Sequence, residues 1–356
     1  MTAEPDLDLL YRVAVMYYEH HRTQEQIGEE LHFTRWKVGR LLAEAREAGI
    51  VRIEVLHPKT RMRDLEEQLT GTFGLRDAVV VAGSGAEDDE ELRARVAEAG
   101  ADYLARLRPS PRLLGVSWGR TLDRLARSLA PGWASGVHVV QINGGLSRSL
   151  RPSSAQDMAS RIAHQGRGTV TVLPTPAIVE QEATRRLLEE DPAVAEVLAQ
   201  AAAADTALFS PGSVDEDSVL VGSGYLNAED LARLRAAGAV GDVAGRFIDA
   251  AGRVVDAELD ARTLGVPLDV LRARPVSVAV VSGAAKHAVC AAVVTSGLCN
   301  TLITDEHTAS HLLSRSATAP VAPERHPAPS PASPSPASPF PASTSPPPDP
   351  DACEDR

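Results

Sequence analysis

Short apolar runs alternate with helical patterns through the middle of the chain, and this alternation restricts the fold more than any other feature. Seven runs are predicted to form strands, at residues 77–83, 112–117, 137–142, 169–174, 206–210, 276–282 and 300–304. Amphipathic helical patterns such as EELRARVAEAGADYLARL lie between most of them. Continuously apolar strands that are separated by helices are typical of a parallel sheet with both faces covered. We therefore predict an α/β domain at residues 77–317, built on a doubly wound, mostly parallel sheet.

Residues 23–49, TQEQIGEELHFTRWKVGRLLAEAREAG, have the pattern of a helix-turn-helix within a domain at residues 1–56. Thr23 followed by Gln26 predicts a capping box at the start of one short helix. Thr34 predicts the cap of a second helix, which Gly49 ends. The inward face of this second helix is predicted to carry Val38, Leu41, Leu42 and Ala45.

The first turns of the second helix carry basic side chains, and this is the part of a helix-turn-helix that enters the major groove. Arginine can read guanine with two hydrogen bonds, and lysine suits phosphates. The predicted DNA-binding residues are Thr23, Gln24, Thr34, Arg35, Trp36, Lys37 and Arg40. The plainer alternative is a small helical bundle that merely exposes a basic face.

Charge is distributed unevenly along the chain. The formal net charge is −12, yet residues 34–63 contain eight Lys and Arg against three Asp and Glu. A basic patch on an acidic body is compatible with DNA binding. The N-terminus carries acidic residues where a signal peptide carries basic ones, and the sequence contains no apolar run of membrane-spanning length. We therefore expect a cytoplasmic location and no membrane partner. The three cysteines form no CxxC pair, so we expect neither a metal site nor a disulfide, and no cofactor motif is present.

The stretch GVSWGRTL has the composition of a phosphate-binding turn between a strand and a helix. Glycines let the backbone approach a ligand closely, and the start of a helix offers free N–H groups. The candidate residues are Gly115, Ser117, Gly119, Arg120 and Thr121. The stretch is neither a Walker loop nor a dinucleotide fingerprint, and ordinary glycine-rich packing is an equal alternative.

Polar residues also follow other predicted strands, where ligands gather in open α/β sheets. These further candidates are Gln141, Asn143, Gly144, Asp242, Arg246 and Lys286. Taken singly, each has a structural alternative, such as a solvated helix lysine for Lys286 and a loop cap for Asp242. Their shared position at strand ends predicts a site for a phosphorylated polyol.

Two further segments complete the predicted organisation. Residues 57–76 are predicted to form a linker helix in which Leu65, Leu69 and Phe73 make one apolar stripe, which serves either the core or a subunit contact. Residues 318–356 contain 13 of the 25 prolines and few large apolar side chains. Such a composition predicts a disordered Pro/Ser-rich tail.

The motifs TQEQIGEELHFTRWKVGRLLAEAREAGIVRIEV, GVSWGRTL, QINGG, VGDVAGRFID and SGAAKHAVCAAVVTSGLCNTLITDE occur in the order typical of one family. The chain resembles the SorC family of sugar-responsive bacterial transcription regulators. The resemblance implies a helix-turn-helix followed by an effector domain similar to sugar-phosphate isomerases and glucosamine-phosphate deaminases. It also implies a phosphorylated sugar as effector, operator DNA as partner and a tetramer built from dimers. It assigns the phosphate to residues 115–121 and the sugar to Asn143, Asp242, Arg246 and Lys286.

Two functions follow from these patterns. The first is a transcriptional regulator, without enzymatic activity, whose affinity for its operator is changed by a phosphorylated sugar. The alternative is a sugar-phosphate isomerase or deaminase with an appended DNA-binding domain. Such an enzyme needs a positioned carboxylate base with a second acid or histidine nearby. Acidic residues at the predicted strand ends are few, apart from TDEH at 304–307, so the regulator is favoured.

Overall fold

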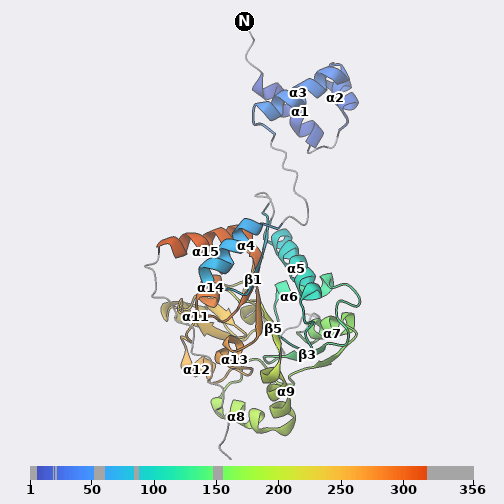
Figure 1. The fold of residues 1–356 in the computed structure, drawn as a ribbon. Coiled ribbons are helices and arrows are strands. Elements are labelled where there is room, and N and C mark those ends of the chain that lie inside the picture. Colours follow the sequence, from blue (N-terminus) through green and yellow to red (C-terminus); the bar gives the residue numbers. More distant parts are fainter. Residues whose placement is uncertain are drawn as a thin grey trace, which may run out of the picture. The chain divides into compact units, whose positions relative to one another are not determined.

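The computed structural model describes residues 6–18, 20, 22–51, 61–83, 88–146 and 155–318 (Figure 1). The helices are α1 Leu7–Tyr18, α2 Gln24–Leu31, α3 Arg35–Glu47, α4 Arg63–Phe73, α5 Asp89–Arg106, α6 Arg120–Ser128, α7 Ala155–Gln165, α8 Glu182–Glu190, α9 Pro192–Ala203, α10 Val219–Gly222, α11 Ala228–Ala236, α12 Ala257–Asp260, α13 Leu268–Arg272, the 3₁₀ turn η1 Ala284–Lys286, α14 His287–Thr295 and α15 Glu306–Thr318. The strands are β1 Asp77–Val81, β2 Leu113–Val116, β3 His138–Gln141, β4 Thr169–Thr171, β5 Thr206–Phe209, β6 Gly241–Val243, β7 Arg246–Ile248, β8 Val276–Val280 and β9 Thr301–Asp305. None of the helices within these described ranges combines the length and the apolar character of a membrane span.

Helices α1, α2 and α3 pack around a small core of their own. Val13, Ile27 and Val38 come from the three helices and are fully buried in it. The capping box of Thr23 and Gln26 and the cap at Thr34 both form as predicted. Between the helices, His32 adopts the left-handed conformation with φ 55° and reverses the chain. The two predicted caps are therefore confirmed, and the three helices are consistent with the predicted helix-turn-helix.

The seven predicted strands form one sheet in the order β1-β9-β8-β5-β2-β3-β4, and each neighbouring pair is parallel. Their sequences are rich in Val and Thr, which suit a pleated surface buried on both sides. The predicted α/β fold class is confirmed. The antiparallel hairpin of β6 and β7 forms a separate two-stranded sheet, which the apolar pattern did not predict because each strand has only three residues.

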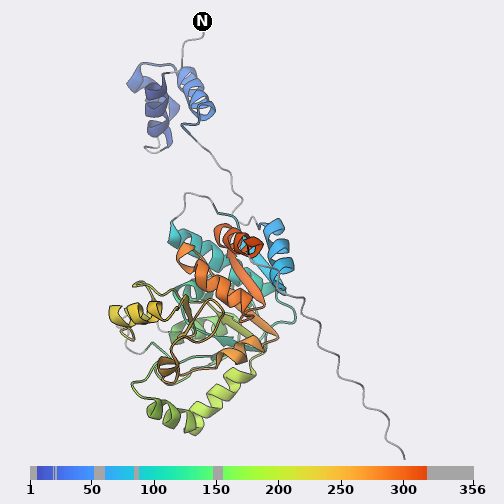
Figure 2. The ribbon, with the colours of Figure 1, turned by 90° about the vertical axis from the view of Figure 1, so that its left-hand side faces the viewer.

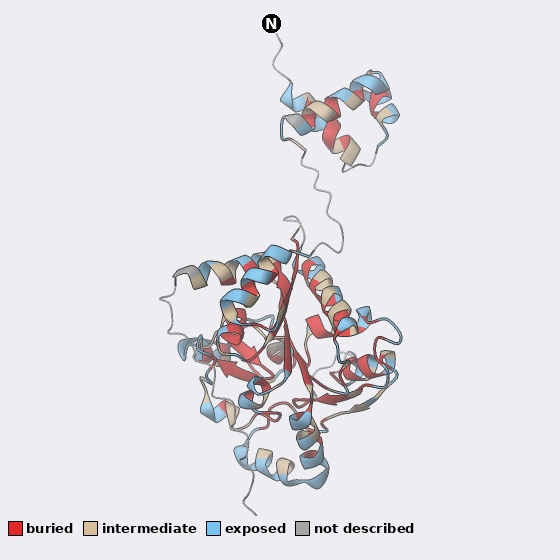
Figure 3. Cartoon of the chain, in the orientation of Figure 1, coloured by how far each residue is buried: buried red, intermediate tan, exposed pale blue. Residues whose placement is uncertain are grey.

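Helices cover both faces of the large sheet, as Figures 1 and 2 show. Successive residues of β1 illustrate the layering, because Ala78 and Val80 face one core cluster while Val79 and Val81 face the other. One cluster includes side chains of α4, α9, α14 and α15, and the other those of α5, α6 and α7. Figure 3 shows the buried sheet between helices whose outer faces are exposed.

Helix α4 occupies the position of the predicted linker helix and packs on β1 and α15. Leu69 is fully buried, and Leu65 and Phe73 pack against the same cluster. Of the two roles proposed for this stripe, the structure supports the core. The predicted tail lies outside the described residues, except for Thr318 at the end of α15.

Candidate functional site

The exposed face of α3 carries the predicted DNA-binding side chains. Trp36 is 89 % exposed, and Arg35, Lys37 and Arg40 are also exposed. Lys37 Nζ lies 3.8 Å from the centre of the Phe33 ring, which holds the lysine near the start of the helix. Trp36 thus lies exposed beside three cations near the start of α3. This face can therefore present both charge and an aromatic surface to a ligand.

Gln24 has a different environment from the rest of this group. A Cβ atom placed on Gly39 would lie 3.3 Å from Gln24 Oε1, so the glycine leaves room for this side chain between α2 and α3. Gln24 is half-buried there. The structure therefore gives Gly39 a packing role within the helix pair.

A cavity of about 40 Å³ lies at the carboxyl ends of strands β2, β5 and β8. It brings together six of the eleven predicted effector residues, which are Ser117, Gly119, Arg120, Thr121, Asp242 and Lys286. Three sequence segments far apart in the chain therefore converge as the strand-end argument predicted. We call this space the strand-end cavity.

The turn between β2 and α6 forms one wall of the strand-end cavity. Gly119 precedes the helix with φ 152°, a conformation that other residues rarely adopt. The first N–H groups of α6 have no partner within the helix and attract anions. Thr121 Oγ1 is buried and has no hydrogen-bond partner among the described residues. A hydroxyl, free N–H groups and the exposed Arg120 together suit a phosphate group.

Lys286 and Asp242 also line the strand-end cavity. Lys286 Nζ donates a hydrogen bond to Ser210 Oγ over 3.2 Å. Burial lowers the pKa of Lys286 to about 8, although the nearby Asp242 opposes this shift. Burial likewise raises the pKa of Asp242 to about 6, opposed by the Gly245 N–H and by Lys286. A bound dianion would compensate the desolvated ammonium.

The segment after β5 was not among the predicted effector residues, yet it lines the same cavity. Gly212 exchanges two backbone hydrogen bonds of 2.9 Å with Asp242. A Cβ atom on Gly212 would lie 2.0 Å from Asp242 Oδ1, so a larger residue at this position would force the buried carboxylate or the backbone to move. Ser210 and Ser213 also line the cavity, together with Arg93 of α5. The feature of the sequence that could have identified Ser210 and Ser213 is their position after the central strand β5.

Three predicted effector residues serve the packing of the sheet and do not line the strand-end cavity. Gly115 lies inside β2, where a Cβ atom would approach Ile142 Cγ2 to 2.6 Å. Gln141 accepts a hydrogen bond from the Leu173 N–H over 3.1 Å. Gly144 accepts one from Trp118 Nε1 over 2.8 Å. These contacts join neighbouring strand ends.

Arg246 and Asn143 also lie outside the cavity lining. The buried guanidinium of Arg246 forms an ion pair with Asp260 and donates to the Gly265 carbonyl over 3.1 Å, which is a structural role. Asn143 is 1 % exposed, and neither polar atom of its side chain has a partner among the described residues. Within the same residues, no cluster of three His, Cys, Asp or Glu side chains could hold a metal ion.

Comparisons with known proteins place this architecture in a family. Residues 57–314 match the family model described as "Putative sugar-binding domain". The deoxyribonucleoside regulator of Bacillus subtilis (strain 168) is 32% identical over 305 residues, which cover 86% of this chain and 97% of that protein. The solved full-length sorbitol operon regulator SorC from Klebsiella pneumoniae matches with a TM-score of 0.66 at 28% identity, over 87% of this chain and 99% of that chain. The chain belongs to the SorC family of transcriptional regulators.

Other SorC-family relatives agree. The transcriptional regulator LsrR of Enterobacter sp. (strain 638) is 31% identical over 311 residues, covering 86% of this chain and 93% of that protein. These relatives are named as transcriptional regulators and not as isomerases or deaminases. The regulator interpretation is therefore confirmed over the enzyme alternative, and DNA and a sugar are the partners that it implies.

Proposed function

We propose that this SorC-family regulator binds operator DNA through α3 and that a phosphorylated sugar in the strand-end cavity changes its affinity for the operator. The observation that carries the proposal is the convergence of Lys286, Arg120 and the start of α6 on one small cavity. Two cations and a helix N-terminus in one place favour a multiply charged anion.

The volume of the cavity supports a phosphate group. About 40 Å³ leaves room for one tetrahedral anion and little more. A larger space of about 390 Å³ adjoins it and shares Trp118, Gly119, Arg120 and Val219 with it. In our proposal the phosphate group enters the strand-end cavity and the sugar occupies the adjoining space.

The polar side chains around this larger space suit a sugar. Asp123, Arg124 and Glu90 line it, and together they offer hydrogen-bond acceptors and donors for hydroxyl groups. Trp118 and Met158 supply an apolar surface for the carbon atoms of the sugar. The names of the deoxyribonucleoside regulator and the sorbitol operon regulator suggest a deoxyribose or a sorbitol derivative as the first sugars to test.

On the DNA side, we propose that Arg35 and Arg40 reach base edges. Lys37 and the two capping threonines, Thr23 and Thr34, contact DNA phosphates, and Trp36 packs on the sugar-phosphate backbone of the DNA. The exposure of these α3 side chains supports this assignment. We also propose a cytoplasmic homo-oligomer, a tetramer built from dimers. Because helix-turn-helix proteins read paired half-sites through paired subunits, operator binding supports the dimers within this assembly.

A thermal-shift screen tests the effector. The full-length protein is heated with 2-deoxyribose 5-phosphate, sorbitol 6-phosphate and other sugar phosphates, and with the unphosphorylated sugars as controls. A ligand at 100 times its Kd should add about 2.7 kcal/mol of stability. The active compound should then change the binding of a DNA fragment selected from random sequences by the protein itself. Stabilisation by unphosphorylated sugars alone would contradict the phosphate assignment.

A further inference from the structure

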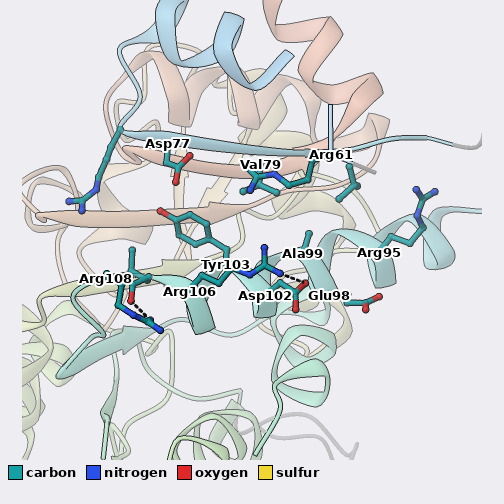
Figure 4. Close-up of a pocket in the computed structure, with 13 residues that line it drawn as sticks. Arg61, Asp77, Val79, Arg95, Glu98, Ala99, Asp102, Tyr103, Arg106 and Arg108 are labelled. Carbon is teal, nitrogen blue, oxygen red and sulfur yellow. Dashed lines mark hydrogen bonds and ion pairs between the residues drawn. The ribbon is translucent and has the colours of Figure 1, made fainter. Parts of the chain in front are cut away.

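A second cavity, about 350 Å³ in volume, lies between the outer edge of strand β1 and helix α5 (Figure 4). It shares no lining residue with the strand-end cavity or with the adjoining sugar space. We call it the edge cavity. The proposed function gives it no role, although its volume is in the range of ligand sites.

The floor of the edge cavity is apolar. It consists of Val79, Val81, Ala99, Leu107 and the ring of Tyr103. In Figure 4 the Tyr103 side chain extends from α5 toward Asp77 on β1. The ring is half-buried, and burial raises the pKa of this tyrosine. A rigid aromatic ring beside two buried valines offers a flat contact surface.

The rim of the edge cavity is cationic. Five arginines line the cavity against three carboxylates, and the arginines are Arg61, Arg76, Arg95, Arg106 and Arg108. Arg108 donates to the carbonyl oxygens of Ala105 and Leu107 over 2.9 and 2.8 Å, and Arg76 donates to that of Pro275 over 3.4 Å. Among the described residues, the hydrogen bonds of these two guanidinium groups thus go to neutral oxygens. Their charge remains available to an anion.

The edge of the sheet is closed to another strand. The outer N–H of Val80 donates to Glu66 Oε1 over 2.9 Å, and the outer carbonyl of Val80 accepts from the Met62 N–H over 2.9 Å. The Ala78 carbonyl accepts from Arg61 Nη2 over 3.2 Å. An extended peptide therefore finds no free hydrogen-bonding groups along this part of β1. Duplex DNA is also a poor fit, because a convex phosphate backbone would leave the apolar floor uncovered.

We propose that the edge cavity is a second ligand site, which takes a small organic anion with a flat apolar body. The body lies on Val79, Ala99 and Tyr103. The carboxylate, sulfonate or phosphate group of the ligand faces Arg76 and Arg108. An apolar floor with convergent cations favours this class over a bare inorganic anion, which would leave the floor exposed, and over a neutral aromatic compound, which would leave the guanidinium groups unused.

Fluorescence titration of the full-length protein with 8-anilinonaphthalene-1-sulfonate tests the proposal. This probe combines a flat aromatic body with a sulfonate. We expect saturable binding of one molecule per chain. In the Arg76→Ala/Arg108→Ala variant, the Kd should rise roughly tenfold or more, because two charge-assisted contacts are lost. Ala99→Phe should abolish binding by filling the cavity. Arg186→Ala, which removes an exposed arginine of α8, is the matched control and should bind normally.

Several outcomes would overturn the assignment. An unchanged Kd in the double arginine variant would show that the probe binds elsewhere, and displacement of the probe by an active sugar phosphate would place it in the strand-end cavity. Loss of probe binding as the protein concentration rises would show that a second copy of the chain fills the edge cavity. Displacement by duplex DNA of any sequence would assign the arginines to DNA. Melting temperatures of all variants exclude unfolding as the cause. If Ala99→Phe fails to fold, the double arginine variant decides alone.

Discussion

Lys286 Nζ donates a hydrogen bond of 3.2 Å to Ser210 Oγ. The lysine lies in the turn after β8 and the serine directly follows β5, so this bond joins two neighbouring strand ends. This contact holds a desolvated ammonium group in the lining of the strand-end cavity. A ligand that replaces the serine as acceptor would change the contact between the two strand ends. We therefore expect effector binding in this cavity to change the relative position of these two segments.

Lys286→Met should weaken the response to the effector and leave DNA binding without effector near normal. The lost charge-assisted contact should raise the required concentration of sugar phosphate roughly tenfold to a hundredfold. A DNA-binding titration with and without the effector measures both effects. A variant that responds at the wild-type concentration would show that Lys286 does not hold the phosphate.

Gly212→Ala should destabilise the protein and impair effector binding together. The new Cβ atom would lie 2.0 Å from Asp242 Oδ1, so either the backbone or the carboxylate must move. We expect a loss of about 1–3 kcal/mol in the free energy of unfolding, which urea titration measures. Gly222→Ala is the control, because a Cβ atom there meets nothing within 4 Å. Equal stabilities of the two variants would contradict the steric argument.

The stability of the protein should contain a pH-dependent contribution from Asp242. Its pKa in the folded protein is raised from 3.8 to about 6, so the folded state holds this proton more tightly than the unfolded chain does. The contribution is therefore fully present below about pH 4 and is lost as the pH rises through about 6. As the pH rises from about 4 to about 6, the free energy of unfolding of the wild type should therefore fall, relative to that of Asp242→Asn, by up to about 3 kcal/mol.

Urea titrations of both proteins between pH 4 and pH 6.5 measure this difference. Asp249→Asn provides a comparison of opposite sign, because hydrogen bonds from Arg253 lower the pKa of the half-buried Asp249. The contribution of Asp249 is present at higher pH and is lost as the pH falls through its lowered pKa. Parallel pH profiles for wild type and Asp242→Asn would refute the proposed titration.

Arg35→Ala should cost about 1–3 kcal/mol of operator binding and relax specificity at one base pair, if Arg35 reads a base. Lys37→Ala should weaken binding to all sequences alike, because a phosphate contact carries no sequence information. Binding assays on the operator and on mutated operators separate these outcomes. Wild-type affinity in both folded variants would remove α3 from the interface, whereas Arg186→Ala should have no effect.

Deletion of residues 320–356 should hardly change the melting temperature or the affinity for DNA. The described core ends within α15, where Leu312 is 1 % exposed, and the deletion removes none of it. Differential scanning calorimetry of the shortened and full chains measures the effect. A fall of many degrees would mean that the tail contributes packing of its own.

Much of the fold could be predicted because its strands are continuous apolar runs and its short helices carry side-chain caps such as Thr23 and Thr34. The site was predicted less completely. A position near a strand end does not specify which way a side chain points, so Gln141 and Arg246 were included although they bond to the protein itself. Ser210 was missed because a single serine after a strand has no distinctive pattern; only the order of strands in the sheet brings it to Lys286.

Glu66 accepts hydrogen bonds from the Val80 N–H and from Arg61 on the outer edge of β1. Unprotected edges of sheets recruit other chains into aggregates, and proteins block them with charged side chains. In this protein a buried carboxylate of α4 performs that protection, and α4 is also a helix of the core. The β1 edge therefore becomes resistant to edge-to-edge aggregation only once α4 has docked. Any intermediate that forms the sheet before α4 docks is the form of this protein that a chaperone would need to shield.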